Sequence, residues 1–447
     1  MNKLKLSLLT IVFLLGTIQL FAQDTQYWLK QYGTYGELLG GTVVGAVSDL
    51  SSTYYNPGSM AFTTDSVLIL TTYSVQAYVI SVNDAYGTDS YLTSSSIKAS
   101  PGIFAIRLPK WLGDEQIAIS YITRYDFDFV AQEQNVTPYS SSQSSSEANE
   151  AFVLENLSEY WPGITWSKVI SNSVGVGATL YFPYRSQSNR NQVLSQTTDS
   201  TNTNSSVIFF EDYKYFNLRA LIKFGASFKL DPLMLGITIT TPSMNIFGSG
   251  STAMNFTSTD VDNANFDEVP TFTSDFQEDL PSQFRSSLSI AVGAAYYLEN
   301  TSFYFSAEWF NRVSEFNIMS PNSFYAQSSG EEIDYNTSYS LNSVFNLGLG
   351  IKYIVNSDFT YYGSITTDQT AFVENSVNKF AISNWDIFHI RSGGEFNIDK
   401  LSITLGFGYG FEANFVDGYR LFGPNNSDRT DAKYHQIDIV FGFTYKL

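Results

Sequence analysis

The chain is poor in the residues that most enzymes use for catalysis. Its 447 residues include two histidines, His389 and His435, and no cysteine. Nucleophilic catalysis needs a nucleophile beside a positioned base, and the sequence contains no Gly-x-Ser-x-Gly elbow. We therefore predict no enzymatic activity, no cofactor and no metal site. The absence of cysteine also excludes disulfides and thiolate-bound zinc.

Arginine and lysine offer a different chemistry, which is the binding of an anionic group. A guanidinium or an ammonium can pair with a ligand carboxylate. Seven candidates lie in segments of alternating apolar and polar residues: Arg107, Arg124, Arg219, Lys223, Arg285, Lys352 and Arg391. Five acids share their faces: Asp126, Asp128, Glu308, Glu395 and Asp438. The cations could therefore bind a ligand, or they could pair with these acids and serve the structure alone.

β-Strands must position these side chains, because the surrounding sequence alternates with a period of two. In 401–411 the odd positions are large and apolar, whereas the even positions are Ser, Thr or Gly. The segment 437–447 repeats this pattern, which is typical of a half-buried strand. Strands are predicted at 65–82, 99–109, 115–133, 150–170, 173–186, 211–229, 232–247, 281–297, 300–316, 336–355, 358–373, 382–397, 400–416 and 432–447.

The connections between these strands alternate in length. Short gaps fall at 171–172, 230–231, 298–299, 356–357 and 398–399. The other gaps are mostly long and polar, and the longest is 248–280. Outer-membrane β-barrels have this layout, with short periplasmic turns and longer outer loops. A soluble β-sandwich is the alternative, but soluble strands average about five or six residues, far fewer than 115–133.

The charges and aromatic residues also indicate a transmembrane barrel. If the apolar face of each strand meets lipid, the seven cations and five acids all fall on the opposite face. Aromatic residues make up 16% of the chain, as expected for a barrel with aromatic girdles at both membrane interfaces. The net charge of −19 argues against a nucleic-acid partner. We predict an all-β fold, a transmembrane antiparallel barrel of about 14 strands.

The N-terminus has the features of a secretory signal peptide. Lys3 and Lys5 precede an almost unbroken apolar run at 6–21, and cleavage is expected near Ala22. A signal anchor is the alternative. We assign 1–22 to the signal peptide, 23–64 to a separate N-terminal segment and 65–447 to the barrel. Apolar and aromatic residues in 23–64 favour a plug inside the lumen over a disordered periplasmic tail. The expected location is the outer membrane of a Gram-negative cell.

The end of this segment resembles the hatch motif of the FadL/TodX outer-membrane transporters of hydrophobic compounds. The residues concerned are 47–58, VSDLSSTYYNPG, and 239–250 and 280–282 resemble stretches of Bacteroidetes-type members. The resemblance spans the whole chain. It implies a plugged fourteen-strand barrel for passive uptake of fatty acids or aromatic hydrocarbons. It also implies lateral exit at a kinked third strand, although 125–128 contains no Gly or Pro that would indicate a kink.

Two groups of residues become site candidates through this resemblance. Asp49, Ser51, Asn56, Pro57 and Gly58 are candidates for a gating element, although the same turn could simply seat the plug. In the predicted outer loop 248–280, a hydrophobic landing groove could be formed by Met254, Phe256, Phe266, Phe272 and Phe276. Interfacial or loop anchors are expected at Trp111, Trp161, Trp166, Trp309 and Trp385.

The expected partners follow from the same interpretation. They are outer-membrane lipid and lipopolysaccharide, a hydrophobic small-molecule ligand and the barrel-assembly machinery, and we expect a monomer. Two other functions stay open. The barrel could be a structural or secretion-system partner without small-molecule transport, because a fold does not fix a function. It could also be a general hydrophilic porin, although a folded plug argues against an open channel.

Overall fold

The computed structural model describes residues 25–63, 67–83, 91–109, 115–137, 145–199, 204–260, 271–373, 385–412, 416–419 and 429–446. The predicted signal peptide, Phe266 and Trp111 lie outside these ranges. In the part of the chain that the structure describes, no helix combines the length and the apolar character that a membrane span requires.

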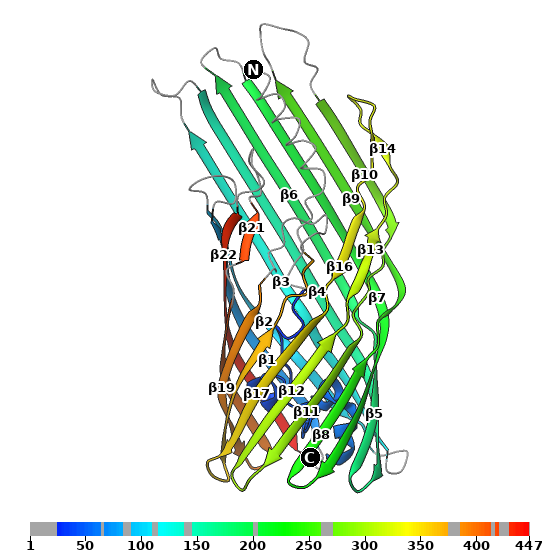
Figure 1. Cartoon of the computed structure of the whole chain (residues 1–447), viewed down its shortest axis with the longest axis vertical. Helices are drawn as coiled ribbons and strands as arrows, with labels where there is room; N and C mark the ends of the chain where they lie inside the picture. The colour runs from blue at the N-terminus through cyan, green and yellow to red at the C-terminus, as the bar shows by residue number, and fades with distance from the viewer. Residues whose placement is uncertain are drawn as a thin grey trace.

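Most of the described chain forms one antiparallel sheet, which β1 closes by pairing with β22 (Figure 1). The result is the predicted barrel of 14 strands, some of which are built from two consecutive segments. The wall segments are β1 (Val67–Asn83), β2 (Tyr91–Arg107), β3 (Gln116–Thr137), β4 (Ser145–Ser171), β5 (Val174–Tyr181), β6 (Tyr184–Asp199), β7 (Asn204–Leu230), β8 (Leu233–Thr240), β9 (Met244–Asp260), β10 (Thr271–Pro281), β11 (Ser289–Tyr297), β12 (Thr301–Phe310), β17 (Val344–Ile354), β18 (Phe359–Asp368), β19 (Ile387–Ile398), β20 (Leu401–Glu412), β21 (Val416–Tyr419) and β22 (Arg429–Lys446).

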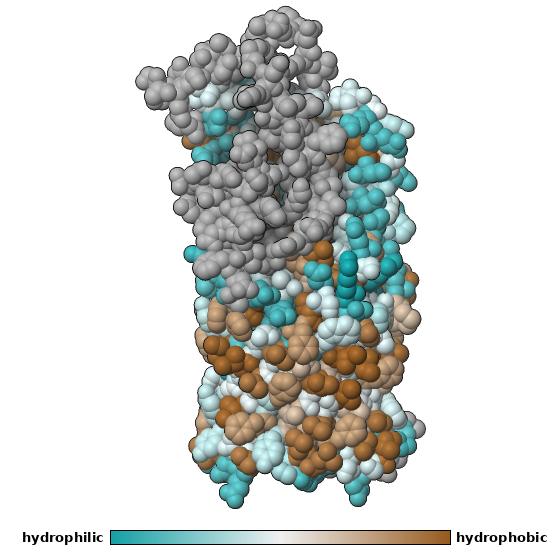
Figure 2. All heavy atoms as spheres, in the orientation of Figure 1, coloured by the Kyte–Doolittle hydropathy of each residue, from teal (hydrophilic) through white to brown (hydrophobic). Residues whose placement is uncertain are grey.

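The lower half of the wall presents an apolar outer surface. On β22, Ile437, Ile439 and Phe443 are exposed, whereas the alternate residues Gln436 and Asp438 are buried on the inside. Figure 2 shows an apolar belt across the visible face of the lower half, with polar residues at the bottom rim and above the belt. The predicted short turns lie at the bottom, for example between β7 and β8 (Figure 1). This distribution matches a lipid-facing band bounded by water on both sides.

The wall is much taller on one side than on the other (Figure 1). Strands β4 and β7 are 27 residues long, whereas β18 has 10 residues. A tilted strand needs only about ten residues to cross the membrane. The long strands on this side therefore continue well beyond the apolar belt as a polar sheet.

The expectation of an outer loop at 248–280 was wrong for the residues of this stretch that the structure describes. Most of that stretch belongs to β9 and β10, which pair with each other in the tall side of the wall. Met254 and Phe256 oppose Asp275 and Thr273, on one face of the sheet. Phe272 and Phe276 lie on the other face and are 43% and 61% exposed. These four side chains therefore do not converge on one groove.

Two short hairpins lie between the wall strands β12 and β17. One takes the end of the predicted strand 300–316 and the start of 336–355, and the other lies in the sequence between them. They consist of β13 (Val313–Met319) with β16 (Thr337–Leu341), and of β14 (Phe324–Tyr325) with β15 (Glu332–Ile333). Side chains of β13 and β16 join an apolar cluster with Tyr27, Phe284 and Phe310. Outer segments are thereby packed against the N-terminal part of the chain.

Residues 25–63, called here the N-terminal segment, lie within the barrel. The segment contains α2 (Thr34–Leu38), α3 (Ser52–Tyr55) and the 3-10 helix η1 (Pro57–Phe62), and nearly all of it is buried. Its hydrogen-bond partners come from strands around the whole wall: Ser100 on β2, Thr179 on β5, Ser227 on β7, Ser306 on β12, Ser364 on β18 and Thr444 on β22. The segment therefore occupies the lower lumen.

Candidate functional site

The turn at Asn56 fixes the N-terminal segment to the wall. The Asn56 side-chain amide donates to the carbonyl of Val44 at 2.9 Å, the carbonyl of Ala226 at 3.1 Å and the hydroxyl of Ser227 at 3.0 Å. Its Oδ1 accepts from the backbone N–H of Gly58 at 3.0 Å. Both the nitrogen and the oxygen of this buried amide are hydrogen-bonded, and Ala226 and Ser227 belong to β7. These contacts hold the turn against β7, as expected if the motif seats the plug, which was the alternative interpretation.

Asp49 and Ser51 organise the turn that leads into α3. One Asp49 carboxylate oxygen accepts from the backbone N–H of Ser51 at 2.8 Å and from the Ser51 hydroxyl. The other accepts from the hydroxyl of Thr34 at 3.2 Å. Burial raises the pKa of the Asp49 carboxyl, and these hydrogen bonds partly offset that rise. The predicted gating residues therefore form two turns, one at each end of α3.

Small wall residues let the segment lie directly against the sheet. Gly236 on β8 and Gly293 on β11 are directly opposite each other. A Cβ on Gly236 would lie 2.0 Å from the carbonyl oxygen of Val44, and one on Gly293 would lie 2.5 Å from the amide nitrogen of Gly45. Two backbones therefore touch at this point, which only glycine permits.

The segment carries a buried acid whose titration falls near neutral pH. Burial, with a smaller contribution from Asp438, raises the pKa of Glu37 to about 8. Docking of the segment therefore favours protonated Glu37. The contribution of this proton to the stability of the docked segment is complete below pH 4.5 and is lost as the pH rises through about 8. Burial lowers the pKa of Lys30 to about 8, so Lys30 stays charged at lower pH whether docked or released.

We expect the segment to become more susceptible to protease as the pH rises from 5 to 8. A protease active across this range, with barrel migration on gels as the integrity check, measures this. The variant Glu37→Gln removes the titrating carboxyl and should give a flat profile. A wild-type profile that is equally flat contradicts the assignment to Glu37.

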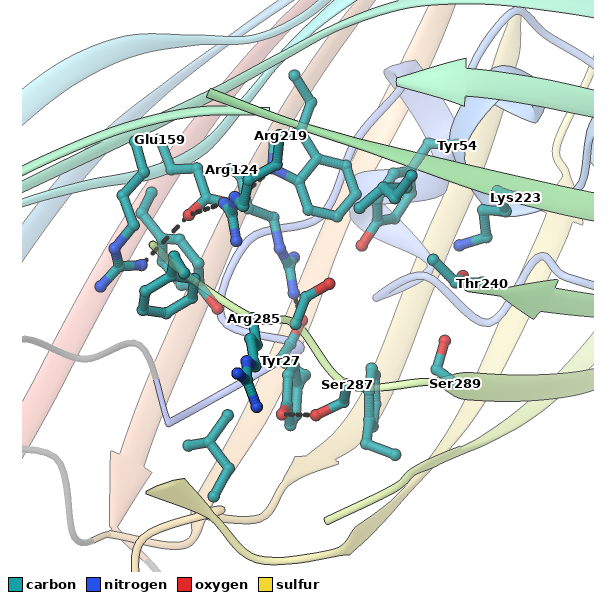
Figure 3. Close-up of a pocket in the computed structure, with 18 of the residues that line it drawn as sticks. Tyr27, Tyr54, Arg124, Glu159, Arg219, Lys223, Thr240, Arg285, Ser287 and Ser289 are labelled. Carbon is teal, nitrogen blue, oxygen red and sulfur yellow. Dashed lines mark hydrogen bonds and ion pairs between the residues drawn. The ribbon is translucent and has the colours of Figure 1, made fainter. Parts of the chain in front are cut away.

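A cavity of about 60 Å³ lies in the lumen between the N-terminal segment and the outer segments (Figure 3). Tyr27 and Tyr54 of the N-terminal segment contribute to its lining, as does the irregular stretch 284–287. Its apolar lining includes Trp161, Leu221, Phe284, Phe310 and Leu341. The cavity therefore combines an aromatic and aliphatic lining with charged groups.

The charged groups around the cavity are mostly cations. Its lining contains the five cations Arg124, Arg185, Arg219, Lys223 and Arg285 but only the two carboxylates Glu159 and Glu308. Glu159 pairs with Arg185 at 3.2 Å and with Arg219 at 2.8 Å, and both guanidinium groups lie over the ring of Phe284. Glu308 accepts hydrogen bonds from Trp28 and Ser289. The acids are therefore occupied, and positive charge is left in excess.

Lys223 is a buried cation with few partners. It is 5% exposed, and its ammonium lies 4.4 Å from the centre of the Tyr54 ring, toward which it points in Figure 3. Among the described residues, none forms a hydrogen bond or an ion pair with this ammonium. The cavity carboxylate Glu308 acts on Lys223 only from beyond ion-pair distance. A buried ammonium without a contacting carboxylate is costly, and an anionic ligand group in the cavity would relieve that cost.

The structure brings together four of the seven predicted cations, which are Arg124, Arg219, Lys223 and Arg285. Arg285 lies outside the strands, because β11 begins at Ser289 and not at the predicted 281. The other three serve other contacts: Arg107 donates to the carbonyl of Thr63, Arg391 lies 3.9 Å from Asp438, and Lys352 lies near the Tyr362 ring.

Several cavity residues were missed from the sequence. Arg185 stands at the end of a predicted strand, and its alternation with Tyr181 could have placed it inside the lumen. Trp161 was expected to be an interfacial or loop anchor but lines the cavity, and Trp385 is also buried, at 2% exposure. Phe284 lies on an irregular stretch, for which the alternation gives no signal.

Strand β3 is irregular where it meets the cavity. Thr123 opposes Tyr160 and Tyr125 opposes Glu159, so Arg124 is an extra residue in β3, a β-bulge. Above it, Asp126 opposes Ser158 on β4, although Ser158 lies on the opposite face from buried Glu159. Because the bulge reverses the alternation, Asp126 and Asp128 lie on the outward face of β3 and not on the face that unbroken alternation predicts.

The ladder between β2 and β3 ends at this bulge. It covers five residue pairs, from Arg107 with Ala118 to Ile103 with Ile122. In the described residues above, β2 pairs with β1 alone and β3 pairs with β4 alone. We call this boundary the seam. β2 has its own irregularity here, because its ladder with β1 skips Gly102, next to Pro101.

Side chains across the seam show how β3 is displaced. Lys98 on β2 opposes Gln76, which donates to the lumen residue Asp438, so Lys98 faces the lumen. It nevertheless pairs with Asp126, which is on the outward face of β3. The inner face of β2 can meet the outer face of β3 only if the upper part of β3 lies on the lumen side of β2.

The sequence matches no known family description and no curated protein. Solved structures share its fold at low identity. The Pseudomonas putida toluene transporter TodX is 14% identical, with a TM-score of 0.60 over 94% of this chain and 99% of that chain. A Pseudomonas aeruginosa FadL homologue is 13% identical with a TM-score of 0.60 and the same coverage. The Ralstonia pickettii toluene transporter TbuX is 11% identical, with a TM-score of 0.53 over 94% and 99%. The chain therefore has the fold of the TodX- and FadL-type channels.

Proposed function

We propose that this protein is an outer-membrane channel for the passive uptake of hydrophobic compounds that carry an anionic head group, such as long-chain fatty acids. The N-terminal segment acts as a plug, the cavity binds the ligand, and the seam is its lateral exit into the membrane. The observation that carries this proposal is the cavity, which joins an apolar lining to an excess of buried positive charge.

The chemistry of the cavity favours an amphiphile over a neutral hydrocarbon. A long apolar chain gains free energy by leaving water for the aromatic and aliphatic lining. Its carboxylate would meet Lys223, whose charge has no carboxylate partner. TodX and TbuX are named as toluene transporters, and toluene would leave the cation surplus of this cavity uncompensated.

Two features support a route through the wall. Arg124 and Tyr125 line the cavity and also stand at the lower end of the seam, so the cavity reaches the place where backbone pairing stops. Below the cavity the N-terminal segment fills the lumen, which leaves the wall as the shorter path to an apolar environment. A ligand that leaves at the seam enters lipid without crossing water.

The cavity must enlarge to hold such a ligand. Its volume is about 60 Å³, less than half of the roughly 150 Å³ that holds one benzene in an engineered protein cavity. The described state is therefore a closed one, and movement of the stretch 284–287 or of the plug has to accompany binding.

Uptake into liposomes that contain the purified protein tests the proposal. Labelled oleate, a neutral long-chain alcohol and a small sugar are compared at equal concentrations against protein-free liposomes. Faster entry of oleate supports the proposal. Entry of the sugar favours a hydrophilic porin, and no acceleration of any solute favours a structural or secretion-system role.

A further inference from the structure

The seam is held by side chains in place of a backbone ladder. The Nζ atom of Lys98 on β2 lies 2.5 Å from Oδ1 of Asp126 and 2.7 Å from Oδ2 of Asp128, both on β3. Among the described residues, the only backbone N–H of β3 in this region that donates to β2 is that of Val130, which donates to the hydroxyl of Ser94 at 3.3 Å. Tyr78 on β1 adds hydrogen bonds to the backbone of Asp128 and stacks on Phe127. Opening the described part of the seam therefore breaks side-chain contacts and no inter-strand ladder.

These ion pairs can separate without leaving a charge stranded in an apolar environment. The side chains of Lys98, Asp126 and Asp128 are 17%, 20% and 40% exposed, so water can reach each of them. Ion pairs of this kind contribute little net stability and are weakened by salt. Buried pairs such as Glu159 with Arg219, by contrast, resist separation. The ion pairs at the seam are thus of the type that separates most easily.

The N-terminal segment contacts the same place from inside the lumen. The Lys30 ammonium donates to the hydroxyl of Ser100 on β2 at 3.0 Å, two residues along the strand from Lys98. Lys30 interacts electrostatically with Asp126, which Lys98 also contacts. Movement of the segment would remove Lys30 from β2 and leave Lys98 facing two carboxylates.

We propose that Lys98, Asp126 and Asp128 form an ionic latch that sets the width of the seam and the rate of lateral release, with Lys30 linking the latch to the N-terminal segment. These are positioning residues, because they act on β3 and are not required to touch the ligand. The effect on release rests on the proposed function, whereas the effect on seam width does not.

Spin labels on the two strands measure the seam width directly. The chain has no cysteine, so Ile97→Cys on β2 and Val130→Cys on β3 supply the only two thiols. Both side chains are well exposed, at 77% and 50%, and tolerate a label. Distances are measured in lipid nanodiscs by pulsed electron spin resonance, for the wild type and for Lys98→Met.

Lys98→Met should lengthen and broaden the distance distribution, and 1 M salt should shift the wild type in the same direction, because the screening length falls to about 3 Å. Asp126→Asn with Asp128→Asn should behave like Lys98→Met. The matched control is Lys168→Met, which breaks the exposed pair with Glu115 away from the seam and should leave the distances unchanged. Unchanged distances in both latch variants overturn the proposal.

Release is measured separately in the liposome assay. The latch variants should accelerate oleate uptake about two- to fivefold, the effect expected from losing exposed ion pairs. A wider seam with unchanged uptake overturns the claim that the latch controls release. If even the wild type fails to transport oleate, the proposed function fails, and the distance measurement still decides whether the latch exists.

Discussion

Replacing Gly236 by valine should make the barrel permeable to small hydrophilic solutes that the native protein excludes. The Cβ of the new side chain would lie 2.0 Å from the carbonyl oxygen of Val44, a backbone atom that cannot turn aside. Overpacking of this kind typically costs about 1–3 kcal/mol. Since about 1.4 kcal/mol changes an equilibrium tenfold, the displaced state of the N-terminal segment should gain up to about a hundredfold in population.

The barrel wall itself should survive this substitution. Gly236 lies in the middle of paired β8, and valine is a good strand residue, so the strand pairing with β7 and β11 is retained. Sugar entry into liposomes or single-channel conductance measures the leak, and heat-modifiable migration confirms the folded barrel. The matched control is Gly363→Ala on β18, where the nearest atom to a new Cβ is 3.7 Å away.

The result also tests whether the N-terminal segment is a plug. A tight barrel in Gly236→Val, with normal folding and a protease-sensitive segment, would show that something else blocks the lumen. The segment would then be a packing element with no role in permeability.

The wall was predictable from the sequence because a membrane barrel repeats one rule along every strand. Lipid selects large apolar residues at alternate positions, as at Ile437, Ile439 and Phe443, and the lumen selects the rest. The short turns were equally visible, because Leu230-Asp231 and four similar pairs separate the alternating segments. These are local signals, and each is read without knowledge of the neighbouring strand.

The site was less predictable because it depends on departures from that rule. The bulge at Arg124 lies in a run without Gly or Pro, so its sequence resembles a regular strand, yet it reverses the orientation of Asp126 and Asp128. A signal existed on the partner strand, where Pro101-Gly102 is a pair that disfavours regular pairing. Pairing between β2 and β3 stops beside both irregularities.

Polarity also misled the assignment of the outer region. The sequence 248–280 is rich in Ser, Thr and Asp, as loops usually are, but β9 and β10 stand above the apolar belt, where water meets both faces of the sheet. A strand in that position needs no lipid-facing residues. Trp161 shows the converse, since an aromatic residue expected at the membrane surface is instead part of the cavity lining.

Replacing Lys223 by methionine should separate the binding of acids from the binding of neutral compounds. The ammonium is buried in the cavity beside Tyr54 and has no carboxylate partner in the described structure. A hydrogen bond to a charged group is worth about 1.5–3 kcal/mol, so oleate should bind roughly 10- to 100-fold more weakly to the variant. Oleyl alcohol has the same chain without the charge, and its affinity should be unchanged or higher.

Ligand titration in nanodiscs measures both affinities, with Trp161 as a fluorescent reporter inside the cavity. Lys352→Met is the control, because Lys352 is a lumen cation that lies away from the cavity, near Tyr362. Stability should not fall in Lys223→Met, since removing a buried charge that lacks a carboxylate partner removes a desolvation penalty. Equal weakening of oleate and oleyl alcohol would mean that Lys223 shapes the cavity without contacting the head group, and unchanged oleate binding would place the carboxylate elsewhere.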